Sequence, residues 1–427
     1  MNQQIKQRIT QLNNGEIPSG YKKTEFGVFP CDWETEKTFG DLFEFFGGLS
    51  KSRDDLGDEG YPYLHYGDLH RGSFNRVSYE QYKQLPKCNI TLTGKETCLM
   101  EDGDVAFLDA SEDLEGTSRA VLIDNPDNKP FIAGLHIIYG KSKDKSLEKW
   151  FKQYITSAES TKKQFQKLAS GFKVYGLNRD TLPKIHVAYP ATTQEQSCIA
   201  EILMKWDEAI ELQEKVIEKQ TNLFEHYIRS LLSPKVGWNR ISLGQVIVEK
   251  DNKTTENDQY QVISSTKKGL FAQKEYFEKQ VASENNVGYK IINKGNIVLS
   301  PQNLWLGNIN YNDSFEIGMV SPSYKVFKIH EGFDELFIAS LMKTPRMLHQ
   351  YILASEQGAS VVRRNLNMEL FYDIPLFLPS LQEQNRISEI IHQLNSVQEL
   401  QNSKLDLLKQ QRKALQQYLL RGIVRCK

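Results

Sequence analysis

The sequence has few cysteines and no close pair of them. The five are Cys31, Cys88, Cys98, Cys198 and Cys426, an odd number without any CxxC spacing. A disulfide framework draws on an even, patterned set, and structural zinc sites draw on closely spaced ligands. The cysteines are therefore interpreted as buried or incidental thiols, and no metal site is expected.

Long apolar runs are missing as well. No stretch approaches the roughly 18 apolar residues that suggest a membrane helix, and the opening "MNQQIKQRIT" is too polar for a secretory signal. We therefore expect no membrane partner and a cytoplasmic location. Hydrophobic residues make up 39% and charged residues 25% of the 427 residues, proportions typical of folded domains. A chain of this length predicts two or three domains.

The chain also lacks an excess of charge of either sign. Its formal net charge is −1, so bulk electrostatics do not indicate a nucleic-acid partner. The distribution is uneven, because residues 141–187 contain eleven basic and four acidic side chains, a combination that could face phosphates. Residues 101–115 contain seven acidic and no basic side chains, and this run is interpreted as a solvated loop.

What the sequence does contain is a repeat. "QEQSCIAEIL" begins at Gln194, and "QEQNRISEII" begins 188 positions later at Gln382. Reading outward, "FPCDWETEKTFGDL" parallels "PKVGWNRISLGQV", and "DGDVAFL" parallels "KGNIVLS". An internal duplication is the simplest account. It divides the chain into a first globular domain at 1–189, a helical region at 190–235, a second globular domain at 236–378 and a second helical region at 379–427.

The globular part of each half is rich in predicted strands. Short apolar runs such as "AVLIDN", "GLHIIYG" and "GNIVLS" are separated by Gly, Asn and Asp, which favour turns. Helical spacing appears in "SLEKWFKQYITSAES" and "DELFIASLMKTPRMLHQYIL". The fold class predicted is α+β, with two mixed globular domains joined by two long antiparallel helices and an internal pseudo-twofold repeat.

Each half ends in a long helical pattern with a heptad seam. The seam residues, spaced alternately by four and three, are Ile199, Leu203, Trp206, Ile210, Gln213, Ile217, Gln220, Phe224, Tyr227 and Leu231, then Ile387, Ile391, Leu394, Gln398, Gln401, Leu405, Leu408, Arg412, Leu415 and Leu419. Two such seams can pack against each other. A helix over residues 194–232 would be roughly 58 Å long. Gln213 and Gln401 occupy equivalent positions, so they either face each other and fix the register or point to solvent.

These features together resemble a known family. The residues that carry the resemblance are "SGYKKTEFGVFPCDWE", "YPATTQEQSCIAEIL", "LPSLQEQNRISEIIHQL" and "LLKQQRKALQQYLLRG". The chain resembles the specificity (S) subunit of type I restriction-modification systems over nearly its whole length. The resemblance implies that each globular domain is a target recognition domain reading one half of a split DNA sequence. It also implies that the chain itself has no catalytic residues.

Partners and cofactors follow from the same resemblance. Double-stranded DNA, two methyltransferase subunits and restriction (motor-nuclease) subunits are expected to bind, with no cofactor in this chain. S-adenosylmethionine would belong to the methyltransferase subunits, and ATP and Mg to the restriction subunits. Two recognition domains on the same face of a DNA duplex lie about one helical turn, or 34 Å, apart. We therefore expect a target with two unlike half-sites separated by roughly five to eight base pairs.

Candidate DNA contacts are polar or basic residues in loops that occur in both halves. They are His65, Tyr66, His70, Arg71, Lys173, Tyr175, Asn178, Arg179, Ser264, Thr266, Lys267, Lys268, Gln302, Asn303, Ser360, Arg363, Arg364 and Asn365. Such side chains supply hydrogen bonds to base edges or to phosphates. Each loop also has a plainer interpretation as basic surface, and Trp305 as packing. His65 and His70 lack a third ligand nearby, which disfavours a metal.

The sequence also bears on two other classes of function. An enzyme is disfavoured because "LTGKET" lacks the glycine spacing of a phosphate loop and "NPDNKP" lacks the acidic partners of a nuclease site. A coiled-coil scaffold that binds only proteins would explain the long seams. It would leave the two globular domains and their matched polar loops without a role.

Overall fold

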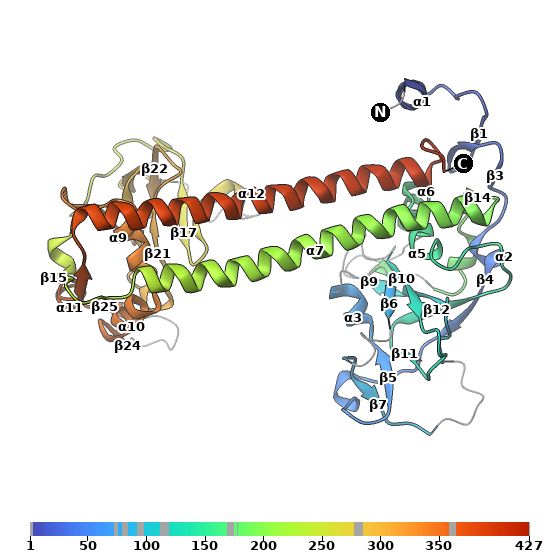
Figure 1. Cartoon of the computed structure of the whole chain (residues 1–427), viewed down its shortest axis with the longest axis horizontal. Coiled ribbons are helices and arrows are strands. Elements are labelled where there is room, and N and C mark those ends of the chain that lie inside the picture. Colours follow the sequence, from blue (N-terminus) through green and yellow to red (C-terminus); the bar gives the residue numbers. More distant parts are fainter. Residues whose placement is uncertain are drawn as a thin grey trace. The chain divides into compact units, whose positions relative to one another are not determined.

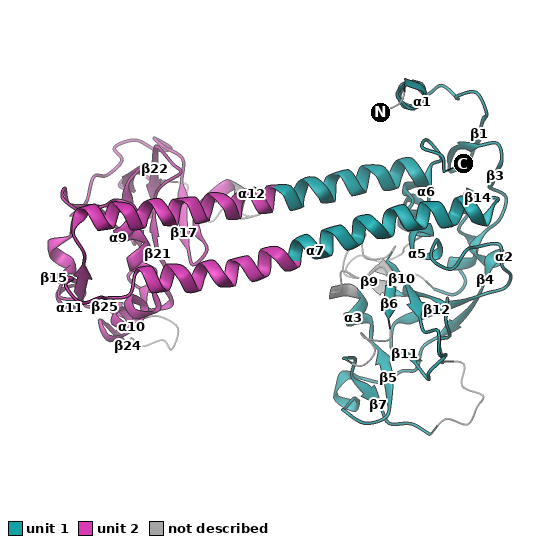
Figure 2. Ribbon diagram, viewed as in Figure 1, with its two compact units in different colours: residues 1–214, 404–427 teal, residues 215–403 magenta. Residues whose placement is uncertain are grey.

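The computed structural model describes residues 3–71, 76–78, 84–91, 98–111, 119–168, 175–176, 178–276, 285–357 and 364–426. The chain forms two compact units (Figure 2). Unit 1 comprises Met1–Glu214 and Lys404–Lys427, and unit 2 comprises Lys215–Ser403. Each unit combines sheets with helices, and this confirms the α+β prediction.

A five-stranded sheet is the centre of unit 1, and its strands lie in the order β4 (Phe43–Gly47), β12 (Ile137–Ser142), β8 (Val105–Leu108), β10 (Ala120–Asp124) and β6 (Arg76–Ser78). Its central strand β8 (Val105–Leu108) is apolar at every position because both of its faces are covered. Val105 and Phe107 belong to one buried cluster, and Ala106 and Leu108 belong to another. The neighbouring strands β10 and β12 are the predicted runs "AVLIDN" and "GLHIIYG".

The elements of unit 1 before the first long helix are α1 (Gln3–Asn13), β1 (Tyr21–Thr24), β2 (Gly27–Pro30), β3 (Trp33–Glu34), α2 (Phe39–Leu42), β4 (Phe43–Gly47), β5 (Tyr61–Leu64), α3 (Tyr66–Arg71), β6 (Arg76–Ser78), β7 (Lys87–Cys88), β8 (Val105–Leu108), β9 (Ala110–Ser111), β10 (Ala120–Asp124), β11 (Ile132–Ala133), β12 (Ile137–Ser142), α5 (Lys152–Ile155), α6 (Glu159–Leu168), β13 (Tyr175–Gly176) and β14 (Tyr189–Pro190). Short 3-10 turns are η1 (Arg53–Asp55) and η3 (Leu182–Lys184). The helix predicted at "SLEKWFKQYITSAES" is therefore divided between α5 and α6.

Unit 2 is built on a four-stranded antiparallel sheet with the order β16-β23-β20-β21. Its elements are β15 (Asn239–Ser242), η4 (Leu243–Gln245), β16 (Ile247–Lys250), β17 (Ile263–Thr266), β18 (Gly269–Ala272), α8 (Gln273–Tyr276), β19 (Lys290–Asn293), β20 (Asn296–Leu299), η5 (Leu304–Leu306), β21 (Ile309–Tyr311), β22 (Ile317–Val320), β23 (Lys325–Ile329), α9 (Glu335–Met342), α10 (Pro345–Leu353), β24 (Ser355–Gln357), β25 (Arg364–Leu366), α11 (Met368–Tyr372) and β26 (Pro375–Leu378). The predicted helix "DELFIASLMKTPRMLHQYIL" is two helices, since Thr344 caps a new one that starts at Pro345.

Two helices far longer than the others follow the globular parts (Figure 1, green and red). They are α7 (Thr193–Leu231, 39 residues) and α12 (Leu381–Leu420, 40 residues). Every predicted seam residue is buried or half-buried except Tyr227, which is 45% exposed. Its neighbour Ile228 packs against the core of unit 2 instead. A straight α-helix drifts against a strict heptad, so a one-residue shift near the end of the seam is expected.

Within unit 1 the two long helices run antiparallel. Arg412 Nε donates to Asp207 Oδ1 at 2.8 Å, and Lys409 Nζ lies 2.7 Å from Glu214 Oε1. Gln213 is buried and neighbours Glu214, so in this unit it is level with the stretch around Lys409. Gln401 belongs to unit 2, and the proposed contact between the two glutamines stays a prediction.

The repeated motif has the same structural task in both units. Gln196 Oε1 accepts from the Glu148 N–H at 2.7 Å, and its Nε2 donates to the Pro190 carbonyl at 2.8 Å. In unit 2, Gln384 Oε1 accepts from the Asp334 N–H at 3.1 Å, and its Nε2 donates to the Pro379 carbonyl at 3.0 Å. Each glutamine thus connects the start of a long helix to the turn that precedes it and to the globular domain.

Replacement of Gln196 by alanine is expected to destabilise unit 1 by roughly 2–4 kcal/mol, because it leaves buried backbone groups without partners. Gln194 is exposed in the same motif, so Gln194→Ala is the matched control with an expected effect under about 0.5 kcal/mol. Urea unfolding followed by circular dichroism measures both. Equal effects of the two substitutions would contradict the bridging role.

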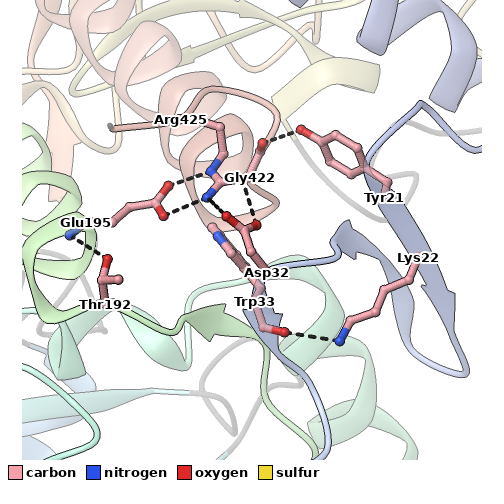
Figure 3. Close-up of polar contacts among 8 residues, drawn as sticks. All are labelled: Tyr21, Lys22, Asp32, Trp33, Thr192, Glu195, Gly422 and Arg425. Carbon is pink, nitrogen blue, oxygen red and sulfur yellow. Dashed lines mark hydrogen bonds and ion pairs between the residues drawn. The ribbon is translucent and has the colours of Figure 1, made fainter.

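A second group of contacts joins the two ends of the described chain inside unit 1 (Figure 3). Arg425 forms paired hydrogen bonds with Glu195 at 2.6 and 2.8 Å and with Asp32 at 3.0 and 2.8 Å. Tyr21 donates from its hydroxyl to the Gly422 carbonyl at 2.5 Å. We call these five residues the terminal clasp. Burial raises the pKa of Tyr21, whereas the hydrogen bonds to Glu195 raise that of Arg425.

Gly422 is the position in the clasp where only glycine fits. Its φ is +67°, and a Cβ there would lie 2.4 Å from Pro30 Cγ. Both the left-handed backbone and the close approach exclude a larger residue without rearrangement. The chain after α12 therefore turns sharply enough for Arg425 to reach Glu195 at the start of α7.

Candidate nucleic-acid interface

The β17–β18 hairpin of unit 2 presents two exposed lysines. Lys267 and Lys268 occupy the turn between Thr266 and Gly269. Thr266 Oγ1 accepts from the Lys268 N–H at 3.0 Å and donates to the Gly269 carbonyl at 3.2 Å, which fixes the turn. The lysine side chains are thus held on a defined backbone while their ammonium groups remain in solvent, the arrangement that phosphate contacts need.

A buried polar network holds this hairpin against β21. Asn310 Nδ2 donates to the Thr266 carbonyl at 2.8 Å and to Ser265 Oγ at 2.7 Å. Asn308 Nδ2 donates to the Ser265 carbonyl at 3.0 Å. Lys343 is an exposed residue whose Nζ reaches the edge of the network and donates to Asn310 Oδ1 at 2.5 Å, and partial desolvation of this ammonium group lowers its pKa. Satisfied buried networks of this kind make a loop position rigid.

The turn that precedes β21 carries the next candidates. Leu304 is buried in the core, and Gly307, at φ +87°, ends the short η5 helix. The carbonyl of Gln302 accepts from the Arg364 N–H at 3.3 Å, and the Arg364 guanidinium lies 4.6 Å from the centroid of the Trp305 ring. Residues separated by about sixty positions, predicted as two independent loops, therefore lie together in unit 2.

Several other candidates in unit 2 are placed differently. Ser264 is buried, and its hydroxyl accepts from Gln273 at 3.3 Å, so its side chain supports the hairpin. Asn303 is half-buried and donates to Ser300 Oγ at 3.4 Å. Gln302 and Asn365 have exposed side chains. Among the described candidates of unit 2, the side chains of Lys267, Lys268, Gln302 and Asn365 are exposed, and those of Thr266, Asn303 and Arg364 are half-exposed.

In unit 1 an aromatic group surrounds Tyr66. Its ring centroid lies 4.4 Å from that of His65 and 5.4 Å, edge-on, from that of His136. His136 Nδ1 is 2.9 Å from Asp109 Oδ1. His65 is buried, its Nδ1 accepts from the Gly67 N–H at 3.2 Å, and burial lowers its pKa. The His65 ring is therefore neutral and stabilises the start of α3, while Tyr66 is 37% exposed.

Of the remaining candidates, some lie near this group in unit 1, and others, in both units, lie outside the described residues. β13 begins at Tyr175 and pairs with β9, which directly follows Asp109. Asn178 Oδ1 accepts from the backbone of Thr181 at 2.9 Å, and Arg179 is exposed. Lys173, Ser360 and Arg363 lie outside the described residues, and for His70, Arg71 and Tyr175 the backbone alone is described.

Sequence reasoning missed His136, Asn308, Asn310 and Lys343. Asp109 was interpreted as part of a solvated acidic run, yet it pairs with His136. A usable signal existed for the asparagines, because "GNINYN" alternates polar and apolar residues as a half-buried strand does. His136 gave no such signal, since its φ of +61° depends on the local turn.

Neither a metal site nor a membrane helix is found in the described part of the chain. No group of three or more His, Cys, Asp or Glu residues there could hold a metal ion. No helix of that part combines the length and apolar character needed to cross a bilayer. What the described surfaces offer is hydrogen-bond donors and positive charge on rigid loops.

Comparison with known proteins agrees with the resemblance seen in the sequence. The family model described as "Type I restriction modification DNA specificity domain" matches residues 30–221. A structure described by the words "complex assembly and conformational transition of the type I R-M system" has a TM-score of 0.60 at 12% identity, over 93% of this chain and 99% of that chain.

Two crystal structures are also similar. One is a type I restriction-modification S subunit from M. genitalium, with 16% identity, a TM-score of 0.48, and 91% and 96% of the two chains covered. The other is an HsdS subunit from Thermoanaerobacter tengcongensis, with 13% identity, a TM-score of 0.47, and 96% and 98% covered. The resemblance to specificity subunits is confirmed by the match to the family model.

Proposed function

We propose, from the type I restriction-modification DNA specificity domain that residues 30–221 carry, that this chain is the DNA sequence-specificity subunit of such a system. Each unit would read one half of an asymmetric, bipartite target. The match of residues 30–221 is the observation that carries the proposal. Unit 2 lies largely outside the matched range, so the support for its role comes from its own side chains. These are the exposed cations of the β17–β18 turn, whose backbone a buried network holds in place.

The side chains indicate which residues would contact phosphates and which would contact bases. In unit 2 the lysines of the β17–β18 turn would contact phosphates, and Arg364 and Gln302 would be placed near base edges. In unit 1 the corresponding candidates are Tyr66 and Arg179. Since the two units differ in these residues, their half-sites would differ in sequence.

The long helices would set the spacing between the half-sites and would serve as docking surfaces. Two methyltransferase subunits would bind this chain, and restriction subunits would join them. S-adenosylmethionine, ATP and Mg would be bound by those partners, and this chain would supply recognition and no catalytic residue. The whole complex would act on DNA in the cytoplasm.

The test is reconstitution with the methyltransferase subunits encoded by the same host. The complex is incubated with genomic DNA and S-adenosylmethionine, and modified bases are mapped by sequencing. Methylation at two short, unlike blocks separated by roughly five to eight unspecified base pairs is the expected result. A chain that assembles with its partners and leaves their DNA preference unchanged would instead be a coiled-coil scaffold.

Replacement of Lys267 and Lys268 by alanine is expected to weaken DNA binding about equally at all sequences. Each lost phosphate contact removes roughly 0.9 from the slope of log K against log salt, so the double variant should lose about 1.8. Fluorescence anisotropy of the complex between about 50 and 200 mM salt measures the slope. Lys274→Ala, at an exposed position outside the turn, is the control and should leave the slope unchanged.

A further inference from the structure

Arg364 differs from the other candidate cations because its position is fixed by an aromatic ring. The Arg364 guanidinium lies 4.6 Å from the centroid of the Trp305 ring, and the backbone of Arg364 is tied to Gln302 on one side and to Gln357 of β24 on the other. A guanidinium stacked on an indole loses less entropy when it binds a ligand than a free side chain does. The geometry is that of a pre-organised donor.

The guanidinium of Arg364 has no acceptor among the residues that the structure describes. Among the described residues, no hydrogen-bond acceptor or carboxylate is paired with the Arg364 side chain, whereas Arg412 and Arg425 are bound to carboxylates. Trp305 cannot take the same part, because its Nε1 is buried and has no partner in the described structure. The indole is therefore the support, and Arg364 is the group that can bind.

We propose that Arg364 reads a guanine in the half-site bound by unit 2, with Trp305 as its positioning residue. The inference rests on the proposed function. Guanine is the base whose O6 and N7 accept two parallel hydrogen bonds from one guanidinium, and that pair is the commonest specific arginine contact. A guanidinium held over a ring samples fewer orientations than a free side chain, and a restricted orientation favours the two parallel hydrogen bonds that a guanine edge accepts.

The experiment compares Arg364→Ala with wild type in the reconstituted complex with its methyltransferase subunits. Wild type should methylate a target whose one half contains a fixed guanine. In the variant, the preference for guanine at that position should fall by roughly 5- to 150-fold, while the other half of the target stays fixed. Trp305→Ala should cause the same loss at the same position, and Trp305→Phe a smaller one.

Arg346→Ala is the matched control, because Arg346 also stacks on an aromatic ring of unit 2, 4.7 Å from the centroid of Phe377. It should leave the target unchanged, and thermal unfolding should show that all variants are folded. An unchanged target in Arg364→Ala, an equal loss at every sequence as for a phosphate contact, or a wild-type target without a fixed guanine in either half would overturn the inference. Wild-type complexes that methylate without any sequence preference would instead remove the proposed function itself.

Discussion

Substitution of Arg425 by alanine is expected to lower the free energy of unfolding of unit 1 by about 3–5 kcal/mol, the cost of breaking a buried ion pair. The Arg425 and Glu195 side chains are 14% and 8% exposed. Without the guanidinium, the Glu195 side chain loses its ion-pair partner in a site that water scarcely reaches. The same change releases the chain after Gly422 from the start of α7, so the ends of the chain should become accessible to protease.

Controls separate the buried pair from the exposed one. Asp32 is 58% exposed, so Asp32→Ala should cost no more than about 1 kcal/mol although it also removes a paired contact with Arg425. Arg425→Met combined with Glu195→Leu removes both buried charges and should recover most of the loss. Chemical unfolding gives the energies. If Asp32→Ala and Arg425→Ala were equally destabilising, the buried pair would not be the source.

The long helices could be predicted well because their period is a local property of the sequence. Two seams with alternating spacing of four and three can be read without knowledge of the partner, and only Tyr227 at the end of the first seam was misplaced. The sequence shows that the glutamines are repeated, but it does not show which groups their side chains bind. Gln196 bonds to Glu148, 48 positions away, and no local pattern shows such a contact.

The candidate interface could be predicted only in part, because burial depends on contacts between residues far apart in the sequence. Polar loops at equivalent places in the two halves pointed to Lys267 and Arg364, which the structure leaves available. Ser264 has the same polar character in the sequence but is buried against Gln273. Composition shows which groups could bind, whereas the sheet register decides which of them face solvent.

Removal of one heptad from each long helix is expected to shorten the spacer of the DNA target. The deletion of residues 215–221 from α7 and 398–404 from α12 keeps the four-and-three alternation and leaves the Asp207–Arg412 and Glu214–Lys409 pairs in place. Seven residues correspond to about 10 Å of helix, and three base pairs span about the same length of duplex. Three base pairs are therefore the upper limit of the shift.

Rotation reduces the shift below that limit. A heptad turns a straight helix by only about 20°, whereas three base pairs turn the duplex by about 100° at roughly 10.5 base pairs per turn. If a recognition unit moves along the DNA but does not turn around it, it meets its half-site at the wrong angle. We therefore expect the spacer to shorten by one to three base pairs. Mapping of methylated sites measures it. Glu218→Ala with Lys219→Ala changes exposed residues of the same heptad without changing length and should keep the original spacer. A shortened chain that methylates the original spacer would show that the helices do not set the distance.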